Sequence, residues 1–161
     1  MALNVIEVIW RYIWVAFKYL IKSYKKGYGF DTFSGLPEAW HAVPEGAYSS
    51  HGNMPNIEGG EFIPGEFSKT LPKFFEEKRP MASLINFDAD LYSSTICALN
   101  HTKPIIDKHT ILIFDEFIMN KNWEQDEYKA LEEFCSNNDY TYEVLAISFF
   151  TKQAAVKIVG I

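Results

Sequence analysis

Cysteine is scarce in this sequence, and its two cysteines do not have the spacing of a metal site. Cys97 and Cys135 both fall in segments that we interpret as helices. Two cysteines without ligand spacing indicate reduced thiols, which are typical of cytoplasmic proteins. We therefore expect a cytoplasmic protein in which both thiols stay free.

Positively charged residues are also few. The sequence has 15 Lys and Arg residues and 21 Asp and Glu residues, which gives a net charge of -6 at pH 7. No Lys and Arg cluster is interleaved with aromatic residues, and a nucleic-acid phosphate backbone needs a basic face. We therefore expect no nucleic-acid partner. Apolar residues make up 48% of the 161 residues, which is enough for one domain, residues 1–161, with a buried core.

A long uncharged apolar run is missing as well. The most apolar stretch, Val5–Ile21, carries Glu7, Arg11 and Lys18 and lacks the small-residue cleavage site of a signal peptide. It is too short and too charged for a membrane span, so membrane contact is not expected.

Residues 4–25 allow two interpretations. Apolar side chains at helical spacing favour one amphipathic helix that begins at Asn4. Alternatively, Asn4–Val8 is a short strand and the helix begins near Arg11. Both interpretations make residues 12–24 helical. For residues 1–26 the sequence does not decide between one amphipathic helix and a strand followed by a helix.

Familiar catalytic arrangements are not found either: there is no Ser-His-Asp order, Cys-His pair or Gly-rich phosphate loop. His41 and His51 lie in residues 38–60, an irregular segment whose length is typical of a functional or mobile loop. A general base could lie there, although histidines on surface loops are commoner. These two histidines are the weak catalytic candidates.

Acids follow two apolar runs of the kind that form buried parallel strands. The runs are Ala82–Phe87 and Thr110–Phe114, and the acids that follow them are Asp88, Asp90, Asp115 and Glu116. Ligands of open α/β sheets bind beyond the carboxyl ends of such strands. The sequence therefore predicts that the acids gather at one ligand-binding edge.

Three of these acids have the chemistry of a magnesium site. Asp88, Asp115 and Glu116 supply hard oxygen ligands, and Mg²⁺ is commonly held by a few carboxylates with positions left for water and substrate. Asp90 precedes a helix-forming segment, so we interpret it as the cap of that helix. Asp31 also follows a short strand, and it either accepts hydrogen bonds from a ribose or forms an Asx turn before Gly35.

The order of the expected elements is that of an α/β fold. A mostly parallel sheet is followed by a carboxyl-terminal antiparallel hairpin, Tyr142–Phe150 with Ala154–Val159. This order is typical of the Rossmann-like sheet of S-adenosylmethionine-dependent methyltransferases. Two further strands are expected, at Tyr28–Phe30 and Glu61–Pro64. Ser68–Glu77 is expected to contain a short helix that Pro72 opens, and Leu91–His101 to form another. A last helix is expected from Asn122 to Ser136, with Asn122 and Gln125 forming a capping box.

Four blocks of the sequence resemble the macrocin O-methyltransferase (TylF-like) family. They occur in that family's order and cover about residues 28–135. The blocks read YGFDTFSGLPE (28–38), GEFSKTLP (65–72), DADLYSST (88–95) and ILIFDEF (111–117).

The resemblance implies a class I methyltransferase that uses S-adenosylmethionine and Mg²⁺ to methylate a hydroxyl of a small molecule, a sugar in characterised members. It implies that Asp88, Asp115 and Glu116 bind the metal. The cofactor would be contacted by Glu7, Asp31, Phe33 and Asp88.

The sequence departs from the family at two places. Ile9–Trp14 stand where glycines let the backbone approach the cofactor, and His109 stands where Gly is usual. We therefore also expect an amino-terminally truncated or degenerate member. The alternative function is a catalytically impaired methyltransferase-like domain that serves as an oligomerisation or partner-binding module, which makes a homo-oligomer an expectation too.

Overall fold

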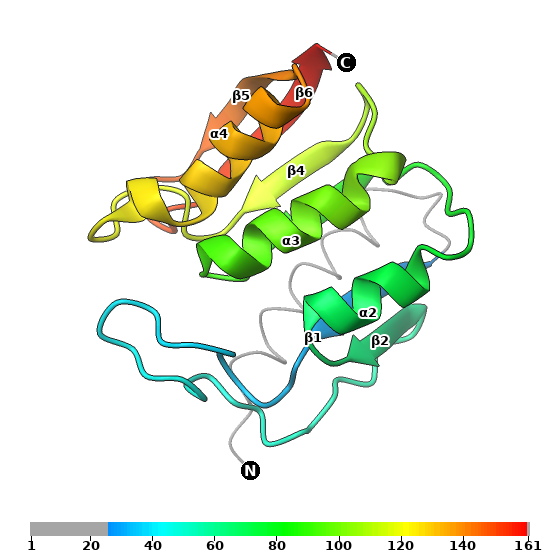
Figure 1. Cartoon of the computed structure of the whole chain (residues 1–161), viewed down its shortest axis with the longest axis vertical. Coiled ribbons are helices and arrows are strands. Elements are labelled where there is room, and N and C mark those ends of the chain that lie inside the picture. The colour runs from blue at the N-terminus through cyan, green and yellow to red at the C-terminus, as the bar shows by residue number, and fades with distance from the viewer. Residues whose placement is uncertain (1–25, 161) are drawn as a thin grey trace. The chain divides into compact units, whose positions relative to one another are not determined.

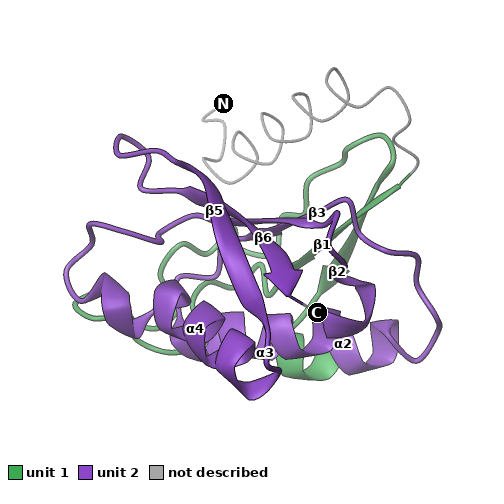
Figure 2. Cartoon of the chain, turned by 90° about the horizontal axis from the view of Figure 1, so that it is seen from above, with its two compact units in different colours: residues 1–70 green, residues 71–161 purple. Residues whose placement is uncertain are grey.

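The computed structural model describes residues 26–160, and the chain divides into two compact units (Figure 2). The first unit is Met1–Thr70 and the second is Leu71–Ile161. The expectations for Glu7 and for the amino-terminal strand or helix lie outside the described residues. The single domain expected over residues 1–161 stays a prediction.

Two short parallel strands form the sheet of the first unit. β1 (Gly27–Asp31) pairs with β2 (Gly60–Pro64), as the sequence predicts for both segments. A Cβ atom at Gly29 would meet the Phe62 ring at 2.6 Å, so only glycine lets this ring lie against β1. The strand ends at Asp31, which is where the sequence places it.

A long loop joins β1 to β2 and is closed by hydrogen bonds around Ser50. The Ser50 hydroxyl is buried and donates to the carbonyl oxygens of Phe33 (3.2 Å) and Asn53 (3.0 Å). The N–H of Gly52 donates to the same Phe33 carbonyl at 2.9 Å. These hydrogen bonds join Phe33 to residues 50–53, and so they hold a segment of the loop that contains no helix.

The helix α2 (Phe67–Phe74) contains the boundary between the units. The sequence predicts this helix, but the expectation that Pro72 opens it is wrong. Pro72 is the sixth of its eight residues. Proline cannot donate a hydrogen bond within a helix and crowds the preceding turn, so its position agrees with a helix that ends soon afterwards.

The second unit contains a four-stranded sheet in the order β3-β4-β6-β5. Figure 1 labels its strands β4, β5 and β6. β3 (Leu84–Phe87) and β4 (Ile111–Phe114) are parallel, and the predicted hairpin of β5 (Thr141–Ile147) and β6 (Ala154–Gly160) is confirmed. β6 also pairs antiparallel with β4. The α/β class is confirmed, but the sheet is mixed rather than mostly parallel, because the last strand lies between two strands that run the other way.

Two helices lie on the same side of this sheet (Figure 2): α3 (Tyr92–Thr102) and α4 (Glu127–Asn137). Short 3-10 helices, η1 (Lys103–Ile105) and η2 (Trp123–Gln125), flank β4. Alternate residues of β4 and β6 are buried, and they form a core with apolar residues of the two helices. Its fully buried members include Leu99, Leu112, Phe114, Leu131, Phe134, Val156 and Ile158.

The helix expected from Asn122 begins later than the sequence predicts. Asn122 has a φ of 64° and precedes η2, and its side chain makes no capping hydrogen bond. α4 begins only at Glu127. The expected capping box is therefore wrong, and the difference places Asp126 and Glu127 at the first turn of a packed helix.

No helix within residues 26–160 is both long enough and apolar enough to cross a bilayer.

Candidate active site

The acids predicted at the strand ends lie in the second unit, at the carboxyl ends of β3 and β4. Phe87 and Phe114 are paired in register at the ends of these strands, and their rings stack with centroids 4.9 Å apart. The N–H of Asp115 donates to the Phe87 carbonyl at 3.1 Å. The chain thus leaves both strands side by side, with Asp88 after one strand and Asp115 after the other.

Asp90 is not a helix cap, which corrects the interpretation from sequence. The residue at the cap position of α3 is Leu91, and no side chain makes a capping hydrogen bond there. Asp90 instead lies at the centre of a tight turn, with a φ of 57°, closed by a hydrogen bond from the Leu91 N–H to the Ala89 carbonyl. Such a turn is strained for a residue other than glycine, and strained residues concentrate at functional sites.

The surroundings of Asp90 favour its neutral form. Burial, and after it the neighbouring charges of Glu116, Asp115 and Asp126, raise the pKa of its carboxyl from 3.8 to about 6. A carboxylate whose pKa lies near neutrality is suited to accept a proton during a reaction. Asp90 is therefore the best general-base candidate among the described residues.

Asp126 and Glu127 complete the acidic cluster, and the sequence analysis did not single them out. Both are buried, and Glu127 is 0% exposed. A signal was present: Glu127 precedes Ala130, Leu131 and Phe134 at helical spacing, so it shares their buried face.

Glu127 joins α4 to the turn that carries the site acids. Its Oε1 accepts a hydrogen bond from the Ala89 N–H at 3.2 Å, whereas its Oε2 is buried without a hydrogen-bond partner. Burial raises the pKa of Glu127 well above its usual range, against the opposing effect of the Ala89 hydrogen bond. This carboxyl therefore supports the site from within the core and has no exposure to solvent.

We expect Glu127→Gln to be more stable than the natural protein at pH 8. Because the folded pKa of Glu127 is raised, its stabilising contribution is complete below the unfolded pKa near 4.5 and is lost as pH rises through the folded pKa. Over that window the natural protein loses about 1.4 kcal/mol per pH unit for this proton, whereas glutamine keeps an acceptor for Ala89 and does not ionise. Urea unfolding between pH 4 and 8 measures the difference, and parallel stability curves would contradict the expectation.

Side chains of the β5–β6 turn contact the acids that follow β4. The Gln153 amide donates to Asp115, and the Lys152 ammonium lies 3.4 Å from Glu116 Oε2. Asn120 donates to the same Glu116 oxygen and accepts from Lys152. Burial raises the pKa of Asp115, and the Gln153 hydrogen bond and the Lys152 charge oppose this rise.

The expected magnesium ligands have the right chemistry but not the arrangement of a metal site. Asp88, Asp115 and Glu116 are carboxylates at one edge, as Mg²⁺ prefers. Among the described residues, however, no three acids, histidines or cysteines are placed so that they could hold an ion. Asp115 and Glu116 instead face Gln153, Asn120 and Lys152, so the residues as placed here do not fit the ion.

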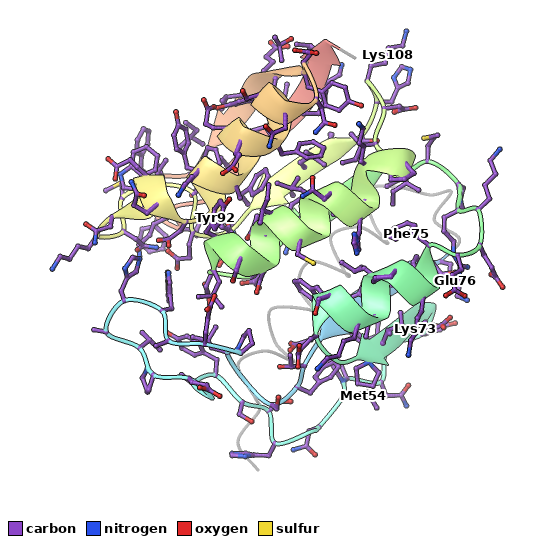
Figure 3. The ribbon with its side chains drawn as sticks, in the orientation of Figure 1. Met54, Lys73, Phe75, Glu76, Tyr92 and Lys108 are labelled. Carbon is purple, nitrogen blue, oxygen red and sulfur yellow. The ribbon has the colours of Figure 1, made fainter. Side chains whose placement is uncertain are left out.

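Tyr92 begins α3 directly after the turn of Asp90 and Leu91 (Figure 3). Its hydroxyl donates to Glu133 of α4 at 2.7 Å, and the Lys129 ammonium lies 4.6 Å from the centre of its ring. These contacts tie the start of α3 to α4. They add a second link, beside Glu127, between the site turn and the same helix.

Two cofactor candidates of the first unit lie within the described residues: Asp31 ends β1, and Phe33 follows it closely. Asp31 forms an Asx turn, since its Oδ1 accepts the Phe33 N–H at 2.8 Å. Phe33 is 2% exposed, has a φ of 57°, and its ring packs edge-to-face against Phe62. The turn interpretation of Asp31 is thus confirmed, and its second carboxylate oxygen is the one left to serve a ligand.

An open polar hollow of about 450 Å³ lies along the loop after Asp31. Its lining residues come from the first unit and are Thr32, Ser34, Leu36, Pro37, Glu45, Gly46 and Glu66.

The histidine candidates lie in the loop of the first unit. His41 and His51 are exposed, and both have a positive φ, 50° and 54°. The His41 ring lies 5.6 Å from the Trp40 ring. The candidate residues that the structure brings together are the acids of the second unit.

Solved structures similar to this chain include methyltransferases. CalS11, a calicheamicin methyltransferase, superposes with a TM-score of 0.70 at 20% identity over 89% of this chain. The apo form of CalS11, described as a TDP-rhamnose 3'-O-methyltransferase, gives 0.60 at 22% identity, and the O-methyltransferase NovP gives 0.59 at 18% identity over 82% of this chain.

The chain has a methyltransferase fold. It spans 65% of the CalS11 chain, 64% of the apo CalS11 chain and 59% of the NovP chain. No family model matches the sequence, and no curated protein sequence matches it. Within this methyltransferase fold, the acids after β3 and β4 occupy the edge where an open α/β sheet binds ligands.

Proposed function

We propose that this protein is an S-adenosylmethionine-dependent O-methyltransferase that acts on a hydroxyl of a sugar or a glycosylated metabolite in the cytoplasm. The observation that carries the proposal is the TM-score of 0.70 with CalS11 over 89% of this chain. The acid cluster at the ligand-binding edge supports it, because O-methylation needs a group that removes the hydroxyl proton. The acceptor class comes from CalS11, whose described substrate is a TDP-linked sugar.

Asp90 is the residue to which we assign proton removal. The hydroxyl oxygen of the acceptor would receive the methyl group, and S-adenosylhomocysteine would leave. The hydroxyl proton passes to the Asp90 carboxylate, so charge and atoms balance. S-Adenosylmethionine, when bound, supplies the electrophilic methyl group. A half-buried turn suits this role, because removing part of the surrounding water keeps the carboxylate basic.

Cofactor contacts are assigned to Glu7, Asp31 and Asp88, with Phe33 as a buried support. The free oxygen of Asp31 could accept hydrogen bonds from a ribose, while its other oxygen stays bound to the Phe33 N–H. The Phe33 ring packs on Phe62 and holds this turn in place. His41 and His51 remain weak candidates for a catalytic residue.

Magnesium is left out of this proposal. Asp88, Asp115 and Glu116 have the donor chemistry for it, but Asp115 and Glu116 contact Gln153, Asn120 and Lys152 and do not fit the ion as placed. No step of the proton transfer described for Asp90 depends on the ion.

The proposal predicts that S-adenosylhomocysteine raises the melting temperature and binds with measurable heat in isothermal titration. Asp31→Asn is expected to weaken this binding about tenfold, equivalent to about 1.4 kcal/mol, through loss of a charge-assisted hydrogen bond. Asp139→Asn, which changes an exposed acid of the second unit, serves as the control with equal change in charge. No thermal shift and no heat at millimolar ligand would refute cofactor binding.

A further inference from the structure

The turn between β5 and β6 inserts polar side chains into the acidic site. The N–H of Ser148 closes the hairpin by donating to the Gln153 carbonyl at 2.9 Å. The N–H of Ile118, in the segment after β4, donates to the Lys152 carbonyl at 3.3 Å. The backbone of the turn is therefore tied to the segment that carries Asp115 and Glu116.

Lys152 is the charged residue that this turn brings to the acids. Its ammonium is 3.4 Å from Glu116 Oε2 and also donates to the Asn120 side-chain oxygen. Asn120 in turn donates to Glu116, so the three side chains form a closed set of contacts. Lys152 has a φ of 63°, a left-handed conformation that is unfavourable for a residue other than glycine.

The charge of Lys152 acts on both acids that follow β4. Its ammonium opposes the rise in the pKa of Asp115 that burial causes, which shows that it influences both acids after β4. Lys152 and Glu116 are both partly buried, with side-chain exposures of 39% and 23%. Attraction between charges is screened less at such positions than on an open surface.

We propose that Lys152 is the built-in counter-ion of the acidic site, and that its ammonium takes the part at Glu116 that a divalent cation would otherwise take. A tethered ammonium needs no ion from solution, and its charge opposes the entry of a second cation. The position of the Lys152 ammonium explains why the acids have the ligand chemistry of a magnesium site although they are not arranged around an ion. The inference concerns the same acids as the proposed function, but it makes no use of the cofactor or the acceptor.

The test is the affinity for Mn²⁺, a paramagnetic probe for the Mg²⁺ position, measured by electron paramagnetic resonance without cofactor. Lys152→Met removes the charge and keeps much of the side-chain length. We expect it to bind Mn²⁺ at least about tenfold more tightly than the natural protein, which corresponds to about 1.4 kcal/mol. Lys108→Met is the control with the same change in net charge. Lys108 is exposed and precedes β4, at the strand end opposite the acids (Figure 3).

A second variant separates charge from backbone strain. Lys152→Gly removes the ammonium and is also free to adopt the positive φ, so it should bind Mn²⁺ as tightly as Lys152→Met. Lys152→Arg keeps the charge and should bind as weakly as the natural protein. Equal affinity in the natural protein, Lys152→Met and Lys152→Gly, or no Mn²⁺ binding by any of them, would overturn the proposal. Loss of S-adenosylhomocysteine binding would refute the proposed function and leave this result unaffected.

Discussion

Asp90→Asn is expected to lower the kcat for methyl transfer by about 10²- to 10⁴-fold, the usual contribution of a general base. Asparagine has nearly the same shape and can occupy the same turn, but it cannot accept the hydroxyl proton. The measurement is transfer of a labelled methyl group from S-adenosylmethionine to a TDP-linked sugar, with Asp139→Asn as the control for loss of one acidic charge. A kcat within threefold of the natural value would exclude Asp90 as the base.

The pH profile of the same reaction gives an independent test of Asp90. Because the pKa of Asp90 is raised to about 6, kcat/KM of the natural protein should fall as pH drops below about 6. The acidic limb should be missing from the residual activity of Asp90→Asn.

The stability of Asp90→Asn must be measured alongside. The raised folded pKa means that Asp90 contributes most stability below pH 3.8 and that this contribution is lost by about pH 6. The variant should therefore gain up to about 3 kcal/mol at neutral pH. A gain in stability together with a loss of turnover would show that activity is not lost through unfolding.

Phe114→Ala is expected to lower the free energy of unfolding by about 3–5 kcal/mol. Phe114 is 0% exposed, its ring stacks on Phe87 and packs 5.2 Å from Phe117, and its backbone pairs with Ala154 of β6. Removing this ring leaves a cavity where the parallel and antiparallel parts of the sheet meet. Urea unfolding followed by circular dichroism measures the loss.

Phe150→Ala is the matched control for that change. It removes the same side chain from the β5–β6 turn, where Phe150 is 96% exposed. We expect a change of less than about 0.5 kcal/mol, as for surface substitutions in general. Similar losses in both variants would contradict the core described for the second unit.

The strands were the most predictable part of this protein. Thr110–Phe114 and the hairpin runs are short, apolar and β-branched, and such local patterns survive into the folded chain. The helix starts were not predictable in the same way. Asn122 and Asp90 have side chains suited to capping, yet both have positive φ values and make no capping hydrogen bond, because tertiary contacts determine these turns.

The candidate site was also predictable only where it depends on local sequence. The acids after two neighbouring strands follow from the order of strands alone, so Asp88 and Asp115 could be placed at one edge from sequence. Glu127 and Lys152 come from segments 38 and 36 residues away from the residues they contact. Only the packing of α4 and the position of the β5–β6 turn bring them to that edge.

The place of β6 between β4 and β5 determines when the site can form during synthesis. β5 leaves the ribosome before β6 but pairs with no other strand of its sheet until β6 arrives. Gln153 and Lys152, which contact Asp115 and Glu116, lie in the turn directly before that last strand. They leave the ribosome after the acids that follow β4, and pairing of strands across such sequence separations is slow. The site of the second unit is therefore completed after translation of residues 154–160 and not alongside translation of β3 and β4.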